Sequence, residues 1–240
     1  MKVIAHRGAP TEALENSFSG FDRALSAKAD RIELDTHLTA DKKILIIHDE
    51  NLSRTSDSSL NVSELSINQL ADIKLNNGEP IPLLEQVITK YLHHLELNIE
   101  LKSGGPSLVD AVVESLPPHE QRKNAIIISS FDVELLRYTA KHYPKETLAL
   151  LWEEKDLSKV HDIMSECECN IFHPEVKIID EELMKFTSEN QWQVFPYISI
   201  KDEKPPETIW KELSTLGIDG LCTNYPREFK AWLEANDGKN

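Results

Sequence analysis

Short runs of apolar and β-branched residues alternate along the chain with polar stretches in which apolar positions recur at a helical period. The apolar runs predict strands at residues 3–6, 31–36, 44–48, 96–102, 125–130, 147–152, 170–173, 194–198 and 220–223. The polar stretches predict helices near residues 16–27, 83–91, 107–116, 133–142, 157–166, 180–190, 208–216 and 227–235. Strands that alternate with helices are typical of βαβ units and therefore of a parallel sheet.

One connection is too short for this arrangement. Seven residues, 37–43, separate the strands at 31–36 and 44–48, whereas a parallel crossover needs roughly a dozen or more. The strand at 44–48 must therefore return as an antiparallel hairpin. Setting it aside leaves eight strands, each followed by a predicted helix, and eight such units in 240 residues predict an α/β fold, the (β/α)8 TIM barrel. A doubly wound open sheet is the alternative.

The segment 51–80 departs from this pattern. It is polar, rich in serine and asparagine, and has little helical period except around residues 63–73. We interpret it as a small insertion between the hairpin and the next barrel helix. The chain contains no internal repeat and no domain linker, so residues 1–240 are predicted to form a single domain.

Two of the predicted strands carry polar residues at alternate positions. Because successive side chains of a strand point to opposite faces, Glu33 and Asp35 share one face of their strand. Asn98, Glu100 and Lys102 likewise share one face of another strand. Carboxylates that point into a barrel are destabilised by desolvation unless a cation lies between them, and oxygen ligands suit Mg²⁺ or Ca²⁺. The alternative is a pair of half-exposed strands with solvated polar faces.

The hairpin adds a histidine to this region. If its turn centres on residues 41 and 42, Asp35 lies opposite His48. His6 also ends a predicted strand, and the active sites of barrels form at the carboxyl ends of the strands. A neighbouring carboxylate raises the pKa of an imidazole, so this register favours His48 as a proton donor.

The charge, the apolar runs and the cysteines of the chain indicate which kinds of partner and which compartment to expect. The chain has 26 lysines and arginines against 41 aspartates and glutamates, a formal net charge of −15, whereas nucleic acids and anionic membranes require clustered positive charge. No apolar run approaches the roughly 20 residues that span a bilayer, and the amino terminus lacks the apolar core of a signal peptide. Cys167, Cys169 and Cys222 show no disulfide spacing. We therefore expect a cytoplasmic protein with no membrane anchor and no nucleic-acid partner.

These residues and their neighbours resemble the glycerophosphodiester phosphodiesterase family. That family carries His-Arg-Gly, Pro-Glu-Asn-Thr, Glu-x-Asp, His-Asp and Glu-x-Lys motifs in this order. The corresponding segments here are His6-Arg7-Gly8, Leu14-Glu15-Asn16-Ser17, Glu33-Leu34-Asp35, His48-Asp49 and Glu100-Leu101-Lys102. Later matches at residues 81–85, 129–131 and 219–226 extend the resemblance over nearly the whole chain.

The resemblance implies a TIM barrel that hydrolyses glycerophosphodiesters to sn-glycerol 3-phosphate and an alcohol. The implied chemistry rests on Glu33, Asp35 and Glu100 as ligands of one divalent metal ion, Mg²⁺ or Ca²⁺, on His6 and His48 as the acid–base pair, and on Arg7 and Lys102 as phosphate ligands. The expected partner is then a small-molecule glycerophosphodiester. The sequence leaves the oligomeric state open.

Further residues are candidates for the pocket around this site. Phe131 and Tyr197 lie at the ends of predicted strands, where aromatic side chains often pack against ligands. His173 ends another predicted strand and is a further candidate. Glu15 is expected to support the site by a hydrogen bond to Arg7 or to a main-chain group.

The chain also departs from the family pattern. The usual proline, threonine, glycine and aspartate are replaced by Leu14, Ser17, Lys42 and Asn224. These changes spare the residues with implied chemical roles and affect the wall of the pocket. Two other functions remain open: a sphingomyelinase D-like phosphodiesterase or lyase on the same barrel, and a barrel that binds phosphodiesters without turnover.

Overall fold

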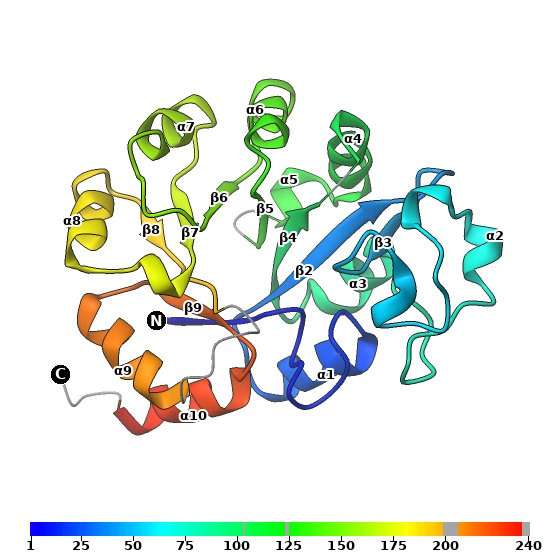
Figure 1. The fold of residues 1–240 in the computed structure, drawn as a ribbon, viewed down its shortest axis with the longest axis horizontal. Helices are drawn as coiled ribbons and strands as arrows, with labels where there is room; N and C mark the ends of the chain where they lie inside the picture. The colour runs from blue at the N-terminus through cyan, green and yellow to red at the C-terminus, as the bar shows by residue number, and fades with distance from the viewer. Residues whose placement is uncertain (103, 123–124, 199–205, 237–240) are drawn as a thin grey trace.

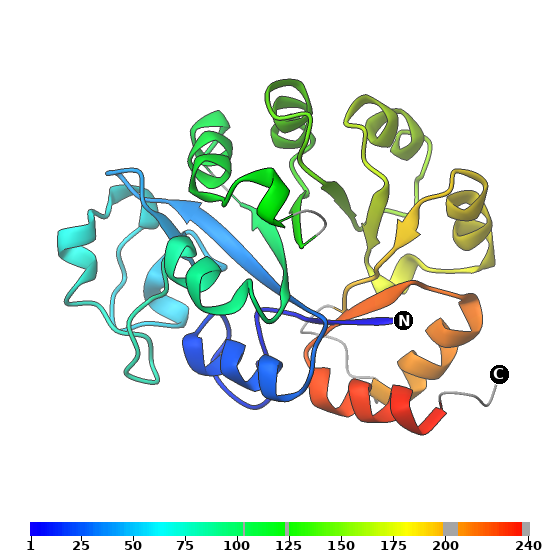
Figure 2. The ribbon, with the colours of Figure 1, turned by 180° about the vertical axis from the view of Figure 1, so that it is seen from behind.

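The computed structural model describes residues 1–102, 104–122, 125–198 and 206–236, and it shows strands surrounded by helices (Figure 1 and Figure 2). The parallel strands in the described residues are β1 (Lys2–Ala5), β2 (Arg31–Leu38), β4 (Glu96–Leu101), β5 (Ile126–Ser130), β6 (Leu148–Trp152), β7 (Ile171–Pro174), β8 (Gln193–Val194) and β9 (Gly220–Thr223). The main helices after them are α1 (Phe18–Ser26), α3 (Leu84–Tyr91), α4 (Pro106–Ser115), α6 (Val133–His142), α7 (Val160–Glu166), α8 (Glu181–Glu189), α9 (Pro206–Leu216) and α10 (Pro226–Asn236). The predicted (β/α)8 barrel is confirmed, and the doubly wound sheet is excluded.

The barrel closes between β8 and β9. Hydrogen-bonded neighbours follow the order β8-β7-β6-β5-β4-β2-β1-β9, so these two strands are the ends of the sheet. The N–H of Cys222 donates to the Pro196 carbonyl at 2.8 Å, and the N–H of Ile198 donates to the Cys222 carbonyl at 3.1 Å. These bonds join the two ends, so the carboxyl ends of the parallel strands surround a common rim.

The predicted hairpin forms, but its register differs from the expected one. Strand β3 (Ile44–Ile46) pairs antiparallel with β2. Just beyond β3, the N–H of Ile47 donates to the Asp35 carbonyl at 3.1 Å. The residue opposite Asp35 is therefore Ile47, and the prediction that His48 lies there is wrong.

The turn explains the shift by one residue. The N–H of Thr39 donates to the Lys43 carbonyl at 2.9 Å, so these two residues form the last pair before the loop. The loop therefore contains three residues, 40–42. Lys42 ends the loop in the left-handed conformation, with φ of 63°. A left-handed last residue is typical of three-residue hairpin loops. His48 consequently lies one residue beyond the position opposite Asp35.

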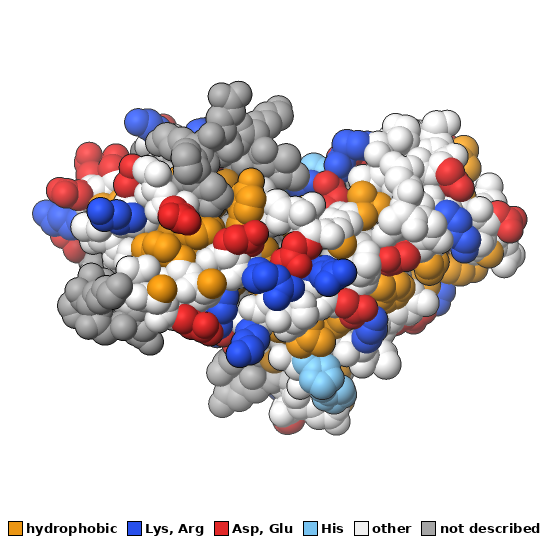
Figure 3. All heavy atoms as spheres, turned by 90° about the horizontal axis from the view of Figure 1, so that it is seen from below, with side chains coloured by type: hydrophobic (Ala, Val, Ile, Leu, Met, Phe, Trp, Pro, Cys, Tyr) orange, Lys and Arg blue, Asp and Glu red, His pale blue; other side chains and the backbone are white. Residues whose placement is uncertain are grey.

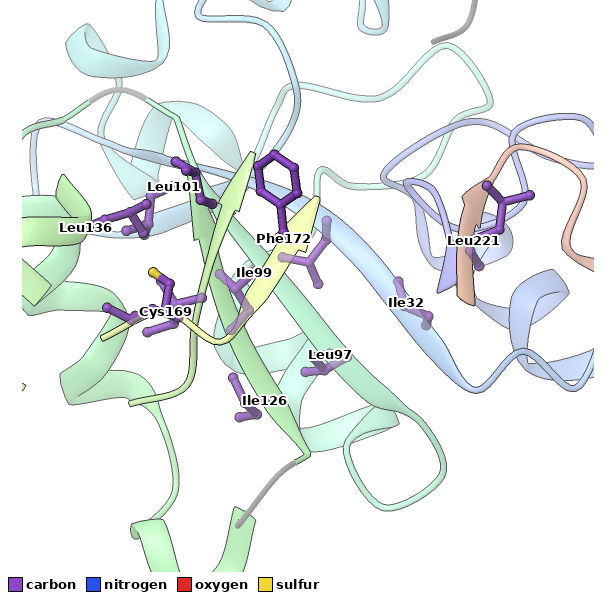
Figure 4. Close-up of a cluster of buried hydrophobic side chains, with 14 of the residues drawn as sticks. Ile32, Leu97, Ile99, Leu101, Ile126, Leu136, Cys169, Phe172 and Leu221 are labelled. Atoms are coloured by element: carbon purple, nitrogen blue, oxygen red, sulfur yellow. The ribbon is translucent and has the colours of Figure 1, made fainter. Parts of the chain in front are cut away.

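Alternation along the strands separates the helix-packed face from the barrel interior. Apolar side chains such as Ile32, Leu97 and Ile99 face the helices and belong to the main core, part of which is drawn in Figure 4. A second cluster fills part of the interior and consists of Ile4, Ile127, Ala149, Ile171, Phe195 and Cys222. Because β2 and β4 pair with Asp35 beside Glu100, the acids of both strands point into the barrel, as the alternation predicts.

The predicted insertion lies between β3 and α3 and projects at the side of the barrel, in cyan in Figure 1. It contains two 3₁₀ turns, η1 (Leu52–Arg54) and η2 (Val62–Glu64), and one short helix, α2 (Ile67–Leu70). Its buried apolar side chains form a cluster with residues of the hairpin: Leu45, Ile47, Leu52, Val62, Leu65, Leu70, Ile73, Leu75, Ile81 and Leu83. This cluster anchors η1 beside the hairpin. A further short helix, α5 (His119–Arg122), precedes β5.

The surface carries both signs of charge. Figure 3 shows acidic and basic side chains interspersed over one face, with small apolar areas between them. In the described part of the chain, no helix is both long and apolar enough to cross a bilayer. The large apolar side chains exposed there are Met1, Leu60 and Phe131. Phe131 lies at the mouth of the site described next.

Candidate active site

Three carboxylates meet at the carboxyl ends of two neighbouring strands. Glu33 and Asp35 come from β2 and Glu100 from β4. One oxygen of each carboxylate lies within 4.8 Å of the other two. Their exposed fractions are 4%, 0% and 6%, respectively. We call these three residues the carboxylate triad.

The triad carries more negative charge than the surrounding protein stabilises. Burial raises the pKa of Glu33 well above its usual value, with contributions from Asp35 and Glu100. Burial and the charge of Asp35 also raise the pKa of Glu100 to about 7. At Asp35 burial opposes ionisation, but Lys102 and Arg7 outweigh it and lower the pKa. One carboxylate is therefore held ionised, while its two neighbours resist ionisation.

The donor set of the triad fits a divalent cation. Glu33 Oε1 is buried and has no hydrogen-bond partner among the described residues. Carboxylate oxygens are the hard ligands that Mg²⁺ and Ca²⁺ take. A cation bound by all three carboxylates would partner this oxygen and favour the ionised form of each acid.

Two basic side chains contact the triad. Lys102 Nζ lies 3.1 Å from Asp35 Oδ1 and 2.5 Å from Glu100 Oε1. Arg7 Nε lies 3.3 Å from Asp35 Oδ2. Burial opposes the charged form of both groups, but the neighbouring acids raise the pKa of Lys102 and of Arg7. Both side chains consequently remain charged beside the triad.

A strained turn after β1 places Arg7 over the triad. Arg7 has a φ of 52° and Gly8 a φ of 90°. The N–H of Arg7 donates to Glu33 Oε2 at 2.9 Å, which fixes the backbone against the triad. A Cβ atom at Gly8 would lie 2.7 Å from the carbonyl carbon of Gly20, so glycine is required at this close approach.

His6 is buried and is held by one hydrogen bond. Its Nδ1 lies 2.8 Å from Asn224 Oδ1. Because an amide oxygen can only accept, Nδ1 carries the proton and Nε2 is left as an acceptor. Nε2 lies 3.9 Å from Glu33 Oε2. Burial, with the charge of Arg7, lowers the pKa of His6 to about 4, so the imidazole is neutral at pH 7.

His48 lies past the end of β3 and is less buried. Its Nδ1 lies 2.6 Å from Asp49 Oδ1, and Asp49 in turn accepts a hydrogen bond from Arg54 Nε. His37 Nε2 contacts the His48 carbonyl at 2.9 Å and positions the backbone. Burial lowers the pKa of His48, and the charge of Asp35 and the bond to Asp49 oppose this shift. The pKa of His48 is therefore lowered overall, and the expectation that a neighbouring carboxylate raises it above its usual value is wrong.

Glu15 links two arginines beside the site. Arg7 Nη1 donates to Glu15 Oε1 at 3.0 Å, and Arg54 donates to both carboxylate oxygens at 2.7 and 2.8 Å. Sequence reasoning did not single out Arg54, although it follows His48-Asp49 closely in a polar segment. It also assigned no role to Asn16, whose amide donates to Asp35 Oδ2 at 2.7 Å. Asn16 lies within the motif Leu14-Glu15-Asn16-Ser17, whereas Arg54 lies outside the family motifs.

These side chains surround a cavity of about 460 Å³. The lining includes most of the residues predicted from sequence: His6, Arg7, Glu33, His48, Glu100, Lys102, Phe131 and Tyr197, together with His173. Asp35 is fully buried beneath the cavity, and Glu15 lies behind Arg7. The rings of Phe131 and Tyr197 meet edge to face with their centroids 5.8 Å apart.

The rim of the barrel thus brings together basic side chains that can balance the charge of a phosphodiester and two imidazoles that can transfer protons during its hydrolysis. A family model described as the glycerophosphoryl diester phosphodiesterase family matches residues 6–228. The chain belongs to this family, and the resemblance seen in the sequence is confirmed.

Curated relatives and solved structures agree with this assignment. The glycerophosphodiester phosphodiesterase of Caldanaerobacter subterraneus is 30% identical over 235 residues, which cover 93% of this chain and 94% of the relative. The enzyme of the same name from Bacillus altitudinis is 30% identical over 240 residues, covering 94% and 95%. The structure of an Oleispira antarctica phosphodiesterase in complex with the product sn-glycerol-3-phosphate has a TM-score of 0.87 at 23% identity and covers 98% of this chain and 97% of its own. The last comparison shows the shared fold.

Proposed function

We propose that the chain hydrolyses glycerophosphodiesters to sn-glycerol 3-phosphate and an alcohol, and that the triad holds one divalent ion, Mg²⁺ or Ca²⁺. The observation that carries the proposal is the meeting of the buried triad with His6 and His48 around one cavity. The names of the relatives from Caldanaerobacter and Bacillus support the choice of substrate.

Neutralising the phosphate charge is the first requirement of the reaction. An electron-rich oxygen approaches a phosphodiester only when the charge on its phosphoryl oxygens is balanced. Arg7 and Lys102 line the cavity beside the triad and bind those oxygens. A divalent ion held by the triad supplies further charge stabilisation there as a Lewis acid.

The two histidines then move the protons. His6 Nε2 accepts the proton of the attacking hydroxyl, because the bond to Asn224 keeps the proton of the ring on Nδ1. The new P–O bond forms as the bond to the alcohol oxygen breaks, and that oxygen takes a proton from His48. Asp49 orients His48, and its hydrogen bond opposes the lowering of the pKa of His48 by burial. The attacking hydroxyl is either water, which gives glycerol 3-phosphate directly, or the glycerol 2-hydroxyl, which gives a cyclic phosphate. On the second route water then attacks phosphorus, the bond from phosphorus to the 2-oxygen breaks, and that oxygen takes a proton to give glycerol 3-phosphate.

Release of glycerol 3-phosphate from glycerophosphocholine tests the proposal. We expect activity with Mg²⁺ or Ca²⁺, none in excess EDTA, and a large loss in Glu33→Gln. Ceramide phosphate released from sphingomyelin, with glycerophosphocholine left intact, would favour the sphingomyelinase D-like alternative. Binding of glycerophosphocholine without turnover at any metal concentration would favour a binding barrel.

We also propose a cytoplasmic location. Cys167, Cys169 and Cys222 are all free and buried, which supports a reducing compartment. Cell fractionation with an antibody against the protein tests this: recovery with the cytoplasmic markers is expected, and recovery with secreted or membrane fractions would contradict it.

A further inference from the structure

The lysine and arginine residues that line the cavity lie on the side of the triad. Arg7 follows β1, Lys102 follows β4, and Arg54 belongs to η1. Among the lining residues that the structure describes, none from β5 onwards is a lysine or an arginine. The other side is formed by residues just after β6, β7 and β8, which we call the acidic wall: Glu153, Glu175 and Tyr197.

The acidic wall combines carboxylates with aromatic rings. Tyr197 forms a backbone bridge to Glu175, which brings the phenol beside that carboxylate. Burial, Glu175 and Glu153 raise the pKa of Tyr197, so both negative charges act on its ring. Phe131 meets the same ring edge to face at 5.8 Å. Two rings and two carboxylates thus face one part of the cavity.

Two ammonium groups border this wall: Lys177 pairs with Glu175, and Lys102 Nζ lies 6.0 Å from the centroid of the Phe131 ring. Glu175 is 8% exposed and forms an ion pair with Lys177, whose side chain is 62% exposed. His173 lines the cavity next to the wall, and burial lowers its pKa to about 4, so it is neutral at pH 7. The wall therefore combines two carboxylates with two aromatic rings, whereas the lysine and arginine side chains of the lining lie among the acids of the triad side.

We propose that the acidic wall binds the leaving alcohol of the substrate and selects alcohols that carry an ammonium or quaternary ammonium group. This inference rests on the proposed function. With the phosphate bound by Arg7 and Lys102, a two-carbon amino alcohol places its nitrogen toward Tyr197 and Phe131. The aromatic faces and the carboxylates attract that cation, whereas a neutral polyol gains no such attraction and an anionic alcohol is repelled.

The test compares two esters that share the glycerol and phosphate groups. We expect kcat/KM for glycerophosphocholine to exceed that for glycerophosphoglycerol by about tenfold in the parent enzyme, the range of a desolvated cation–π contact. Glu153→Gln and Tyr197→Leu should each bring this ratio toward one. Glu154→Gln is the matched control, because Glu154 is an exposed neighbour that does not line the cavity, and it should leave the ratio unchanged.

Inhibition by tetramethylammonium gives a second measurement that requires no leaving group. Competitive inhibition should weaken in Glu153→Gln, an exposed position whose substitution leaves the core intact, and stay unchanged in Glu154→Gln. Equal kcat/KM for the two esters in the parent, or a preference and inhibition unaltered by Glu153→Gln, would overturn the inference and leave the proposed function standing. Turnover of neither ester would contradict the proposed function itself.

Discussion

His6 and Asn224, 218 positions apart in the sequence, share a hydrogen bond of 2.8 Å between Nδ1 and Oδ1. The bond joins the ends of β1 and β9, which are neighbours in the barrel. The amide oxygen keeps the ring proton on Nδ1, so Nε2 is the free acceptor. Burial, with the charge of Arg7, lowers the pKa of His6 to about 4, although the hydrogen bond to Asn224 opposes this shift. Asn224 thereby orients His6 as a base, and burial keeps the ring neutral.

Asn224→Asp should raise the pKa of His6, because a carboxylate in place of the amide stabilises the imidazolium form. A base is inactive when protonated, so the acidic limb of the kcat/KM profile should move to higher pH. Steady-state rates between pH 4 and 9 measure this limb. An acidic limb at the same pH in Asn224→Asp and the parent would refute the role of His6 as the base.

The two histidines should differ in their response to the leaving group. A general acid contributes roughly 10²–10⁴ in rate when the departing alkoxide needs a proton, and little when a nitrophenolate departs. His48→Ala should therefore recover much of its activity on glycerol 3-(p-nitrophenyl phosphate) relative to glycerophosphocholine. His6→Ala should stay slow on both. Equal losses for both variants on both substrates would rule out this division of roles.

The metal-free protein should lose stability as the pH rises from 6.5 to 8. The pKa of Glu100 is about 7 in the fold against an ordinary value of 4.5, so the folded state binds more protons in this window and unfolding becomes easier as pH increases. The raised pKa of Glu33 acts in the same direction. The lowered pKa values of His6, His37, His48 and His173 act in the opposite direction, and their effect fades above pH 6.5 as the imidazoles of the unfolded chain lose their protons.

Thermal unfolding in EDTA at the two pH values measures this effect. Glu100→Gln should show a smaller decrease in Tm than the parent, and saturating Mg²⁺ or Ca²⁺ should remove the decrease in the parent. A parent Tm that rises with pH over this interval in EDTA would contradict the electrostatic description of the triad.

Glu15→Gln should weaken phosphate binding. Burial opposes its ionisation, but hydrogen bonds and charge from Arg54 and Arg7 lower the pKa of Glu15 and keep it ionised between them. Loss of a charged hydrogen-bond partner should raise KM by about tenfold, with a smaller effect on kcat. The control is Glu12→Gln, which removes a surface ion pair with Arg227. A KM unchanged in Glu15→Gln would show that Arg7 is positioned without it.

The triad and the barrel were predictable because both depend on short-range periodicity. Alternation at Glu33 and Asp35 sets the direction of each side chain, and regular βα units set the parallel register that adds Glu100. No contact between distant segments is needed to deduce either feature.

Other features depend on the closed structure. The position of His48 depends on the left-handed conformation of Lys42, which the sequence pattern does not specify. The contact of Arg54 with Glu15 requires the insertion to pack beside the barrel rim. The acidic wall lies at the ends of three adjacent strands, and barrel closure brings it into the same cavity as the triad.

³¹P NMR of glycerophosphocholine incubated with the enzyme tests the central claim most directly, because it identifies the bond that breaks. We expect a glycerol 3-phosphate signal with Mg²⁺ or Ca²⁺, no product in excess EDTA, and no product with Glu33→Gln. Phosphocholine as the product, or equal formation of glycerol 3-phosphate in EDTA, would contradict the proposed metal-dependent hydrolysis.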